Sequence, residues 1–334
     1  MLQQLHRQPD IYRILVPLPK NPLRYLNAYV IKGKKENLVI DTGFKRPECE
    51  KALREGLQEL DVDLKHTALF LTHLHGDHTG LVHLFADAGC PVYMNQIDYD
   101  YLVASGDGST WKIAEDNYMR EGMPPSEIKH QFSNQARTYS PDPDFAIIPV
   151  ADGDEISLAD CTFRVVHTPG HTPGQCCLYL PQEEIFFTAD HILFNITPNI
   201  QVWYHMPQAL QHYLDSLEKV KDLPVRLALP GHREGQTQIR PRVEAILAHH
   251  QQRLAETWHA VYDHPDSTAY EIAPHLTWSM RGRKWPDFPP TQKWFALGET
   301  LAHLEYLVDH HTLTVYEKDG IRHYGLPAMS YCSE

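Results

Sequence analysis

Cysteine is scarce in this sequence, and its spacing excludes the common cysteine-based sites. No pair has the C-x-x-C spacing of zinc ribbons and dithiol redox motifs. Most of the cysteines lie in apolar runs typical of strands, so we expect buried free thiols, with Cys176 and Cys177 in the core rather than acting as a redox pair. The six positions are Cys49, Cys90, Cys161, Cys176, Cys177 and Cys332.

Long hydrophobic runs are also missing. No window approaches roughly 18 consecutive apolar residues, so we expect no membrane-spanning helix and no membrane partner. Residues 1–7 lack the apolar core of a signal peptide. A reducing cytoplasm is therefore the expected compartment.

Positive charge is in deficit. The chain has 30 Lys and Arg against 43 Asp and Glu, which gives a net charge of −13. Such a chain repels the phosphates of nucleic acids, so we expect a small-molecule substrate and no nucleic-acid partner. An apolar content of 42% is ordinary for a globular protein, and 334 residues suggest two domains. The 22 histidines exceed what packing needs and fit metal chemistry.

Three histidines and an aspartate follow a predicted buried strand at residues 68–72. These side chains are His73, His75, Asp77 and His78. Imidazole and carboxylate groups are the ligands that zinc, iron and manganese favour. In an extended or turning segment the first two share one side, while Gly76 lets the chain turn the last two towards a second centre.

Further residues of the same kind end or follow other predicted strands. Each would be a structural histidine or a turn aspartate if it stood alone. Together with the histidine cluster they supply enough donors for two metal ions that share a bridging carboxylate. They are Asp41, His171, Asp190 and His232.

Hydrophobic periodicity predicts an α/β sandwich with its site along one edge. We expect strands at residues 11–18, 27–32, 37–41, 68–72, 90–94, 145–150, 155–158, 162–167, 175–180, 184–188 and 225–229. We expect helices at residues 48–60, 79–88 and 208–220. Residues 95–145 break this rhythm and are rich in aromatic side chains, among them Trp111 and Tyr118. They predict an inserted lid of two short helices, whose aromatic residues fit a substrate pocket and simple packing equally well.

The pattern becomes helical after about residue 239. We expect a long helix, a short helix begun by a capping box at Thr268–Glu271, and a third helix at residues 291–310. A hairpin is expected around Lys318-Asp319-Gly320. These elements predict a winged-helix-like domain. Solvent exposure is the default for the helical His249, His250, His310 and His311, and for the small basic group Arg281, Arg283 and Lys284.

The H-x-H-x-D-H cluster, the His171 loop, the Asp190 turn and His232 occur in the order that resembles the metallo-β-lactamase superfamily. The run Asp41-Thr42-Gly43 is similar to that superfamily's D-T-G strand end. The resemblance covers about residues 10–235 and implies an αββα sandwich, with residues 1–238 as the metallo-β-lactamase domain. Within the superfamily, the chain resembles the branch of hydroxyacylglutathione hydrolases and quorum-sensing lactonases. Residues 239–334 resemble the tail of the lactamase-β-like endoribonuclease group.

The resemblance also implies roles. One metal ion is assigned to His73, His75 and His171, and the second to Asp77, His78 and His232. Asp190 would bridge both ions, and Asp41 would support the site through hydrogen bonds. The two ions, zinc by preference and iron or manganese as alternatives, would lower the pKa of a bridging water from 15.7 to about 7. The resulting hydroxide would attack a small ester, thioester or lactone, with Asp77 as the candidate catalytic proton acceptor.

Two alternatives stay open. The tail suggests a metal-dependent nuclease acting on RNA, and a chain that had lost hydrolysis would be a binding or redox module. The complete ligand set argues against the second alternative. A nuclease needs a basic face, whereas the third tail helix offers Lys293 against Glu299, Glu305 and Asp309. We therefore expect the tail to pack on the domain, to support a homodimer or to wall the pocket.

Overall fold

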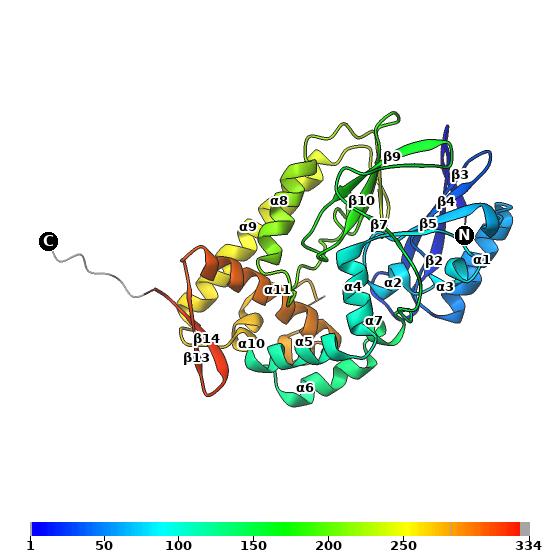
Figure 1. Ribbon diagram of the computed structural model, residues 1–334. Coiled ribbons are helices and arrows are strands. Elements are labelled where there is room, and N and C mark those ends of the chain that lie inside the picture. Colours follow the sequence, from blue (N-terminus) through cyan, green and yellow to red (C-terminus); the bar gives the residue numbers. More distant parts are fainter. Residues whose placement is uncertain (1, 281, 328–334) are drawn as a thin grey trace.

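Two β-sheets lie face to face at the centre of the molecule, and helices cover both outer faces (Figure 1). The computed structural model describes residues 2–280 and 282–327. This arrangement confirms the αββα sandwich predicted from the sequence.

The first sheet changes from antiparallel to parallel pairing at β4. Strands β4 and β5 are buried and apolar, which is typical of parallel strands covered on both faces. Because they run in parallel, the residues after their carboxyl ends, Asp41 and His73, meet at one edge of the sheet. In order the strands are β1 (Leu2–Arg7), β2 (Asp10–Pro17), β3 (Tyr25–Lys32), β4 (Asn37–Ile40), β5 (Thr67–Phe70), β6 (Val92–Asn95) and β7 (Ile148–Val150).

The second sheet is antiparallel except for the parallel pair β11 and β12. His171 lies between β9 and β10, Asp190 follows β11, and His232 follows β12. In chain order the strands are β8 (Glu155–Leu158), β9 (Cys161–His167), β10 (Cys176–Leu180), β11 (Ile185–Ala189) and β12 (Leu227–Pro230).

The two sheets share a buried apolar layer. Phe70 of β5 belongs to the same core cluster as Phe163 of β9 and Phe187 of β11. The ring of Tyr29 on β3 meets Phe187 edge-on, with centroids 5.3 Å apart. This packing fixes the two sheet edges relative to each other, and so brings together the loops that carry the histidines and aspartates.

Helices pack on the outer faces of the sheets. The first sheet is covered by α1 (Pro47–Glu59), with η1 (Leu64–His66) and α3 (His83–Ala86) beside it. The second sheet is covered by α8 (Ala209–Val220) and the first half of α9 (Arg240–Asp263). Each covering helix turns apolar residues inward, such as Leu53 of α1 and Tyr213 of α8, both 0% exposed.

Near the histidine cluster the structure differs in detail from the sequence prediction. The single helix expected at residues 79–88 is absent; α2 (Gly76–Thr79) ends where it was to begin, and only the short α3 lies within that range. The Leu81 N–H donates to Thr42 Oγ1 (3.1 Å), so α2 ends where the chain crosses the loop after β4. Strand β1 was not expected, because its polar glutamines hide the β pattern.

The insert at residues 95–145 is helical and contains more helices than the two expected. They are α4 (Gln96–Ser105), α5 (Ser109–Arg120), α6 (Pro125–Lys129), η2 (His130–Ser133) and α7 (Gln135–Thr138). Helix α4 begins at the end of β6, where the Asn95 side chain accepts from Ile97 N–H as an N-cap.

The C-terminal elements match the expected order, including the capping box between Thr268 and Glu271. They are α9, α10 (Ala269–Ile272), η3 (Ala273–His275), η4 (Trp285–Asp287), α11 (Pro290–Asp309), β13 (Thr314–Lys318) and β14 (Ile321–Gly325). A winged-helix domain is not shown. Val243 and Ile246 of α9 and Ala302 of α11 instead join the core formed by α8 and the second sheet.

The cysteines agree with the expected free thiols. Cys176 and Cys177 are both buried in β10. Every cysteine in the described ranges is free, whereas Cys332 and Arg281 lie outside them. In the same ranges no helix combines the length and hydropathy that crossing a bilayer requires.

Candidate metal centre

The seven residues singled out in the sequence come together at the edge where the two sheets meet. Among the residues that the structure describes, three overlapping groups could hold a metal ion, with the ligand atoms of each group within 4.8 Å of one another. The groups are His73, His75 and His171; His73, His78 and Asp190; and Asp77, His78 and His232.

The first group is a compact histidine triad. His75 Nδ1 lies 3.1 Å from His73 Nε2 and 3.1 Å from His171 Nε2. The three ring nitrogens therefore point at a common position. His73 and His75 come from the loop after β5, and His171 comes from the loop between β9 and β10.

Asp190 connects this triad to the second group. Its Oδ2 lies 3.7 Å from His171 Nε2 and 3.4 Å from His232 Nε2, and its Oδ1 lies 3.6 Å from His78 Nε2. Asp77 Oδ2 lies 3.4 Å from His232 Nε2. One carboxylate thus stands between histidines of both groups, as expected for a bridging ligand.

The far ring nitrogens of two of these histidines are held by the surrounding backbone. His171 Nδ1 donates to the carbonyl of Asn199 and His232 Nδ1 donates to the carbonyl of Tyr25, each at 2.9 Å. A carbonyl only accepts, so Nδ1 carries a proton in both rings and Nε2 faces the cluster. This is the orientation that a metal-binding histidine needs.

Asp41 supports His78 in the way predicted. Its Oδ2 lies 2.8 Å from His78 Nδ1, and its Oδ1 accepts from the Thr72 N–H at 2.9 Å. Asp41 is 2% exposed and adopts a positive φ of 61°, which aspartate tolerates better than most residues. It therefore fixes both the ring of His78 and the end of the strand that delivers His73.

Several buried polar atoms at the centre have no hydrogen-bond partner among the described residues. They are His78 Nε2, His232 Nε2 and Asp190 Oδ1. Their distances of 3.4–3.6 Å to opposite groups exceed the usual N–H···O range of about 2.7–3.2 Å. Unpartnered buried donors and acceptors are costly, so their convergence fits a site built for a cation.

The protonation states fit the same interpretation. Burial lowers the pKa of His75 to about 3 and lowers the pKa of His73 and of His171, so these rings are neutral. Burial opposes ionisation of Asp77, but the neighbouring His232 brings its pKa to about 2. The Asp77 carboxylate is therefore charged at neutral pH.

Asp98 of α4 joins the two ligand loops and was not identified from the sequence. It is fully buried and accepts from Leu74 N–H (2.9 Å), Thr172 Oγ1 (2.7 Å) and Gly174 N–H (2.5 Å). Burial raises its pKa to about 6. A lone aspartate among the polar residues of the insert gives no sequence signal for such a role.

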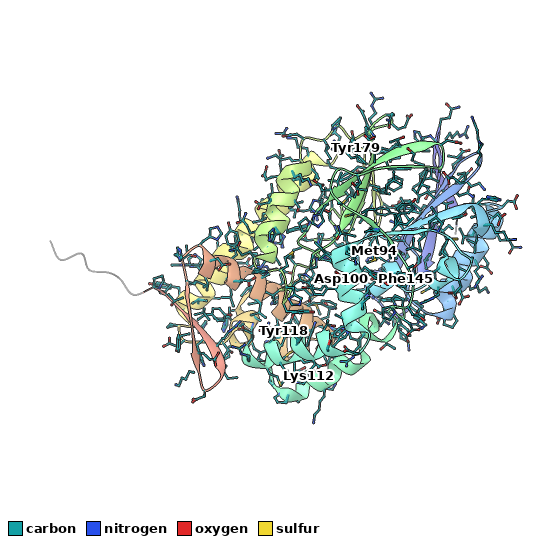
Figure 2. All side chains as sticks on the ribbon, in the orientation of Figure 1. Met94, Asp100, Lys112, Tyr118, Phe145 and Tyr179 are labelled. Atoms are coloured by element: carbon teal, nitrogen blue, oxygen red, sulfur yellow. The ribbon has the colours of Figure 1, made fainter. Side chains whose placement is uncertain are left out.

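A cavity of about 1310 Å³ opens beside His75, larger than the roughly 300–1,000 Å³ typical of ligand sites. Its walls come from the insert, from the loop after β11, and from α11 and β14. Trp203, which was also missed, lies with its ring centroid 6.2 Å from His75. In Figure 2, Tyr118 lies on α5 towards the C-terminal helices, where its ring is 4.1 Å from Trp294, and the exposed Lys112 extends from the same helix into solvent.

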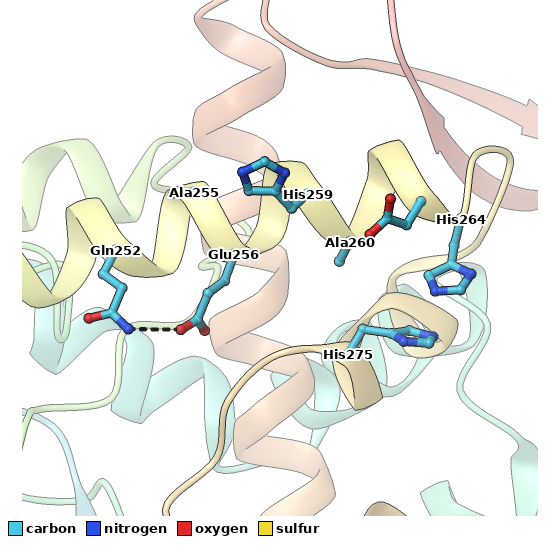
Figure 3. Close-up of a pocket in the computed structure, with 8 residues that line it drawn as sticks. Gln252, Ala255, Glu256, His259, Ala260, His264 and His275 are labelled. Carbon is cyan, nitrogen blue, oxygen red and sulfur yellow. Dashed lines mark hydrogen bonds between the residues drawn. The ribbon is translucent and has the colours of Figure 1, made fainter.

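A second hollow, of about 370 Å³, lies along α9 and η3 (Figure 3). Its histidines include His264 and His275, whose rings stack 3.9 Å apart. Within the described chain, none of its residues belongs to a group that could hold a metal ion. The candidate metal groups therefore lie beside the larger cavity, which His75 lines.

The family model of the Metallo-beta-lactamase superfamily matches residues 22–232. A crystal structure of a metallo-beta-lactamase family protein from Thermus thermophilus has a TM-score of 0.80 and 27% identity, and covers 95% of this chain and 98% of its own. A beta-lactamase domain protein from Burkholderia ambifaria shares the fold, with a TM-score of 0.80 and 23% identity over 97% of this chain and 94% of its own.

A curated relative from Emericella nidulans is named an atrochrysone carboxyl ACP thioesterase. It is 25% identical over 245 residues, which is 72% of this chain and 62% of that protein. The first curated relatives are matched over only 60–64% of their own length. With the family match over most of the chain and the His/Asp cluster in place, the chain belongs to the metallo-beta-lactamase superfamily.

Proposed function

We propose that the protein is a dinuclear-metal-dependent hydrolase of a carbonyl ester, thioester or lactone, with thioesters as the first class to test. The observation that carries the proposal is the position of Asp190 within 3.7 Å of histidines from both groups. Its unpartnered Oδ1 and the unpartnered Nε2 atoms of His78 and His232 fit a pair of cations.

Each of the seven candidate ligands has a proposed role. His73, His75 and His171 would hold one ion, and Asp77, His78 and His232 the other, with Asp190 shared. The ions, when bound, polarise a carbonyl and lower the pKa of a water from 15.7 to about 7. The charged Asp77 carboxylate is the candidate to accept a proton from the nucleophile. Imidazole with carboxylate suits zinc first, and iron or manganese as alternatives.

The cavity supports a substrate larger than a simple ester. Aromatic rings of Tyr101, Trp111 and Trp203 line it, and such surfaces bind apolar acyl groups. The relative named as an ACP thioesterase supports the choice of a thioester. The insert at residues 95–145 would then act as a lid over this cavity.

The test combines elemental analysis with a hydrolysis panel of thioesters, lactones and carboxylic esters. We expect about two transition-metal ions per chain and hydrolysis of at least one class. Asp190→Ala should lose both properties. Full metal content with no hydrolysis of any carbonyl substrate would contradict the proposal.

The nuclease alternative is less well supported. A recognition helix must expose basic residues to the groove of a nucleic acid, but α11 is buried along most of its length. Its Lys293 is also paired with Glu127 at 2.6 Å. We expect no salt-sensitive RNA binding. Neutralising 6–10 phosphates would weaken affinity by roughly 10³–10⁵ between 50 and 200 mM salt, so a steep slope in a labelled-RNA titration would favour the nuclease.

We also propose, from composition and charge, a cytoplasmic protein without membrane or nucleic-acid partners. Four expectations from the sequence stay predictions: the homodimer, the division into residues 1–238 and 239–334, the winged-helix-like character of the tail, and the branch-level resemblances. Analytical ultracentrifugation tests the dimer, and limited proteolysis tests the boundary near residue 238.

A further inference from the structure

Asn199 links a histidine of the metal centre to the C-terminal helices. Its backbone carbonyl accepts from His171 Nδ1 at 2.9 Å. Its side-chain Nδ2 donates to Glu299 Oε2 and to the carbonyl of Phe295 on α11, each at 3.2 Å. A continuous set of hydrogen bonds therefore runs from the histidine triad to α11.

Glu299 is itself held by the neighbouring helix α9. Arg253 Nε lies 3.3 Å from Glu299 Oε1, and the two side chains are only 8% and 13% exposed. Arg253 Nη1 donates to the carbonyl of Thr277 at 2.7 Å, and its guanidinium lies 4.4 Å from the Trp278 ring centre. An ion pair so shielded from water is weakly screened, so α9 fixes the carboxylate that Asn199 contacts.

The backbone of α11 also packs closely against the loop that carries Asn199. A Cβ added at Gly298 would come within 3.0 Å of Gln201 Cβ, which is closer than side chains pack. Ile200, which lies between Asn199 and Gln201 in the sequence, is fully buried. The loop is therefore confined on one side by α11 and on the other by the His171 ring.

We propose that Glu299 and Arg253 are positioning residues of the metal centre. They hold Asn199 so that its carbonyl keeps the proton of His171 on Nδ1 and turns Nε2 towards His75 and Asp190. The C-terminal helices thus complete the centre without supplying a ligand. The consequence for metal binding rests on the proposed function, whereas the control of the His171 tautomer does not.

The test compares Glu299→Ala with Glu299→Gln and with Thr300→Val. The glutamine retains an oxygen that can accept from Asn199. Thr300 is buried on the same helix, but its hydroxyl donates to the Ala296 carbonyl of that helix, so Thr300→Val controls for a general disturbance of α11. The first readout is the His171 tautomer by ¹H–¹⁵N NMR in the metal-free protein. The second is affinity for each ion by chelator competition.

We expect Glu299→Ala to give a mixed His171 tautomer and to weaken binding of one ion by about 10–100-fold. Glu299→Gln should recover most of both properties, and Thr300→Val should match the wild type. If Glu299→Ala fails to fold, Asn199→Ala, Glu299→Gln and their double variant replace it. The double variant should weaken ion binding by no more than the larger of the two single changes.

A pure Nδ1–H tautomer and unchanged ion affinities in Glu299→Ala would overturn the inference, as would an equal effect of Thr300→Val. The two proposals fail separately. A wild-type protein that binds no metal would remove the proposed function, while the tautomer in the metal-free protein would still decide the role of Glu299.

Discussion

At the scale of single residues, Asp190 and His73 should have different effects on metal content. Asp190 lies near histidines of both groups, whereas His73 closes the histidine triad. We expect His73→Ala to lose about one of two ions, and Asp190→Ala to lower the content of both. Elemental analysis measures this, with the exposed His66→Ala as control. Wild-type metal content and activity in Asp190→Ala would contradict the two-metal centre.

The protonation of His232 predicts how metal binding depends on pH. Burial lowers its pKa, but the carboxylates of Asp190 and Asp77 raise it to about 10 overall. A ligand imidazole must be neutral, so binding at pH 8 should expel this proton, and affinity should fall as pH falls below the pKa. Calorimetry in two buffers of different ionisation heat should show net proton release, to which His232 and His78, whose pKa Asp41 and Asp190 also raise, both contribute. Binding without proton release would contradict this assignment.

At the scale of elements, the insert should determine which acyl groups fit. Trp111 and Tyr118 line the cavity from α5, and Trp203 lines it beside His75. We expect alanine at each position to change the ratio of kcat/KM for a bulky over a small thioester by about tenfold, with metal content unchanged. Lys112→Ala, on the exposed side of α5, is the matched control. Equal losses for both substrates would indicate that these residues only support packing.

The sequence predicts which histidines and aspartates cluster, because they lie in short runs at strand ends. His73 to His78 could be recognised from six adjacent residues. Asn199 and Glu299 are 100 positions apart and meet only in the fold, so no local pattern reveals them. His250 was expected to be exposed but is fully buried, with its Nδ1 3.1 Å from His303 Nε2, because α9 and α11 pack against each other there. His310 and His311 are exposed, as expected.

At the scale of the molecule, the C-terminal helices should be needed for a stable sandwich. Val243 and Ile246 of α9 are fully buried against α8 and the second sheet. Losing two such contacts removes about 1.5–3 kcal/mol each, so a fragment of residues 1–238 should unfold at a temperature lower by roughly 10 °C or more. Differential scanning fluorimetry compares the fragment with the full chain. An equal unfolding temperature would instead support two independent domains.

The position of the ligands along the chain has a consequence for biosynthesis. The first triad closes only when residue 171 has been made, and the second group needs His232. The carboxylate that holds the Asn199 loop comes later still, at Glu299. Synthesis must therefore pass Glu299 before the candidate cation site can take its final shape. We therefore expect the proposed metal ions to enter after this point of synthesis, so that a cell short of the ion would accumulate a folded chain without metal.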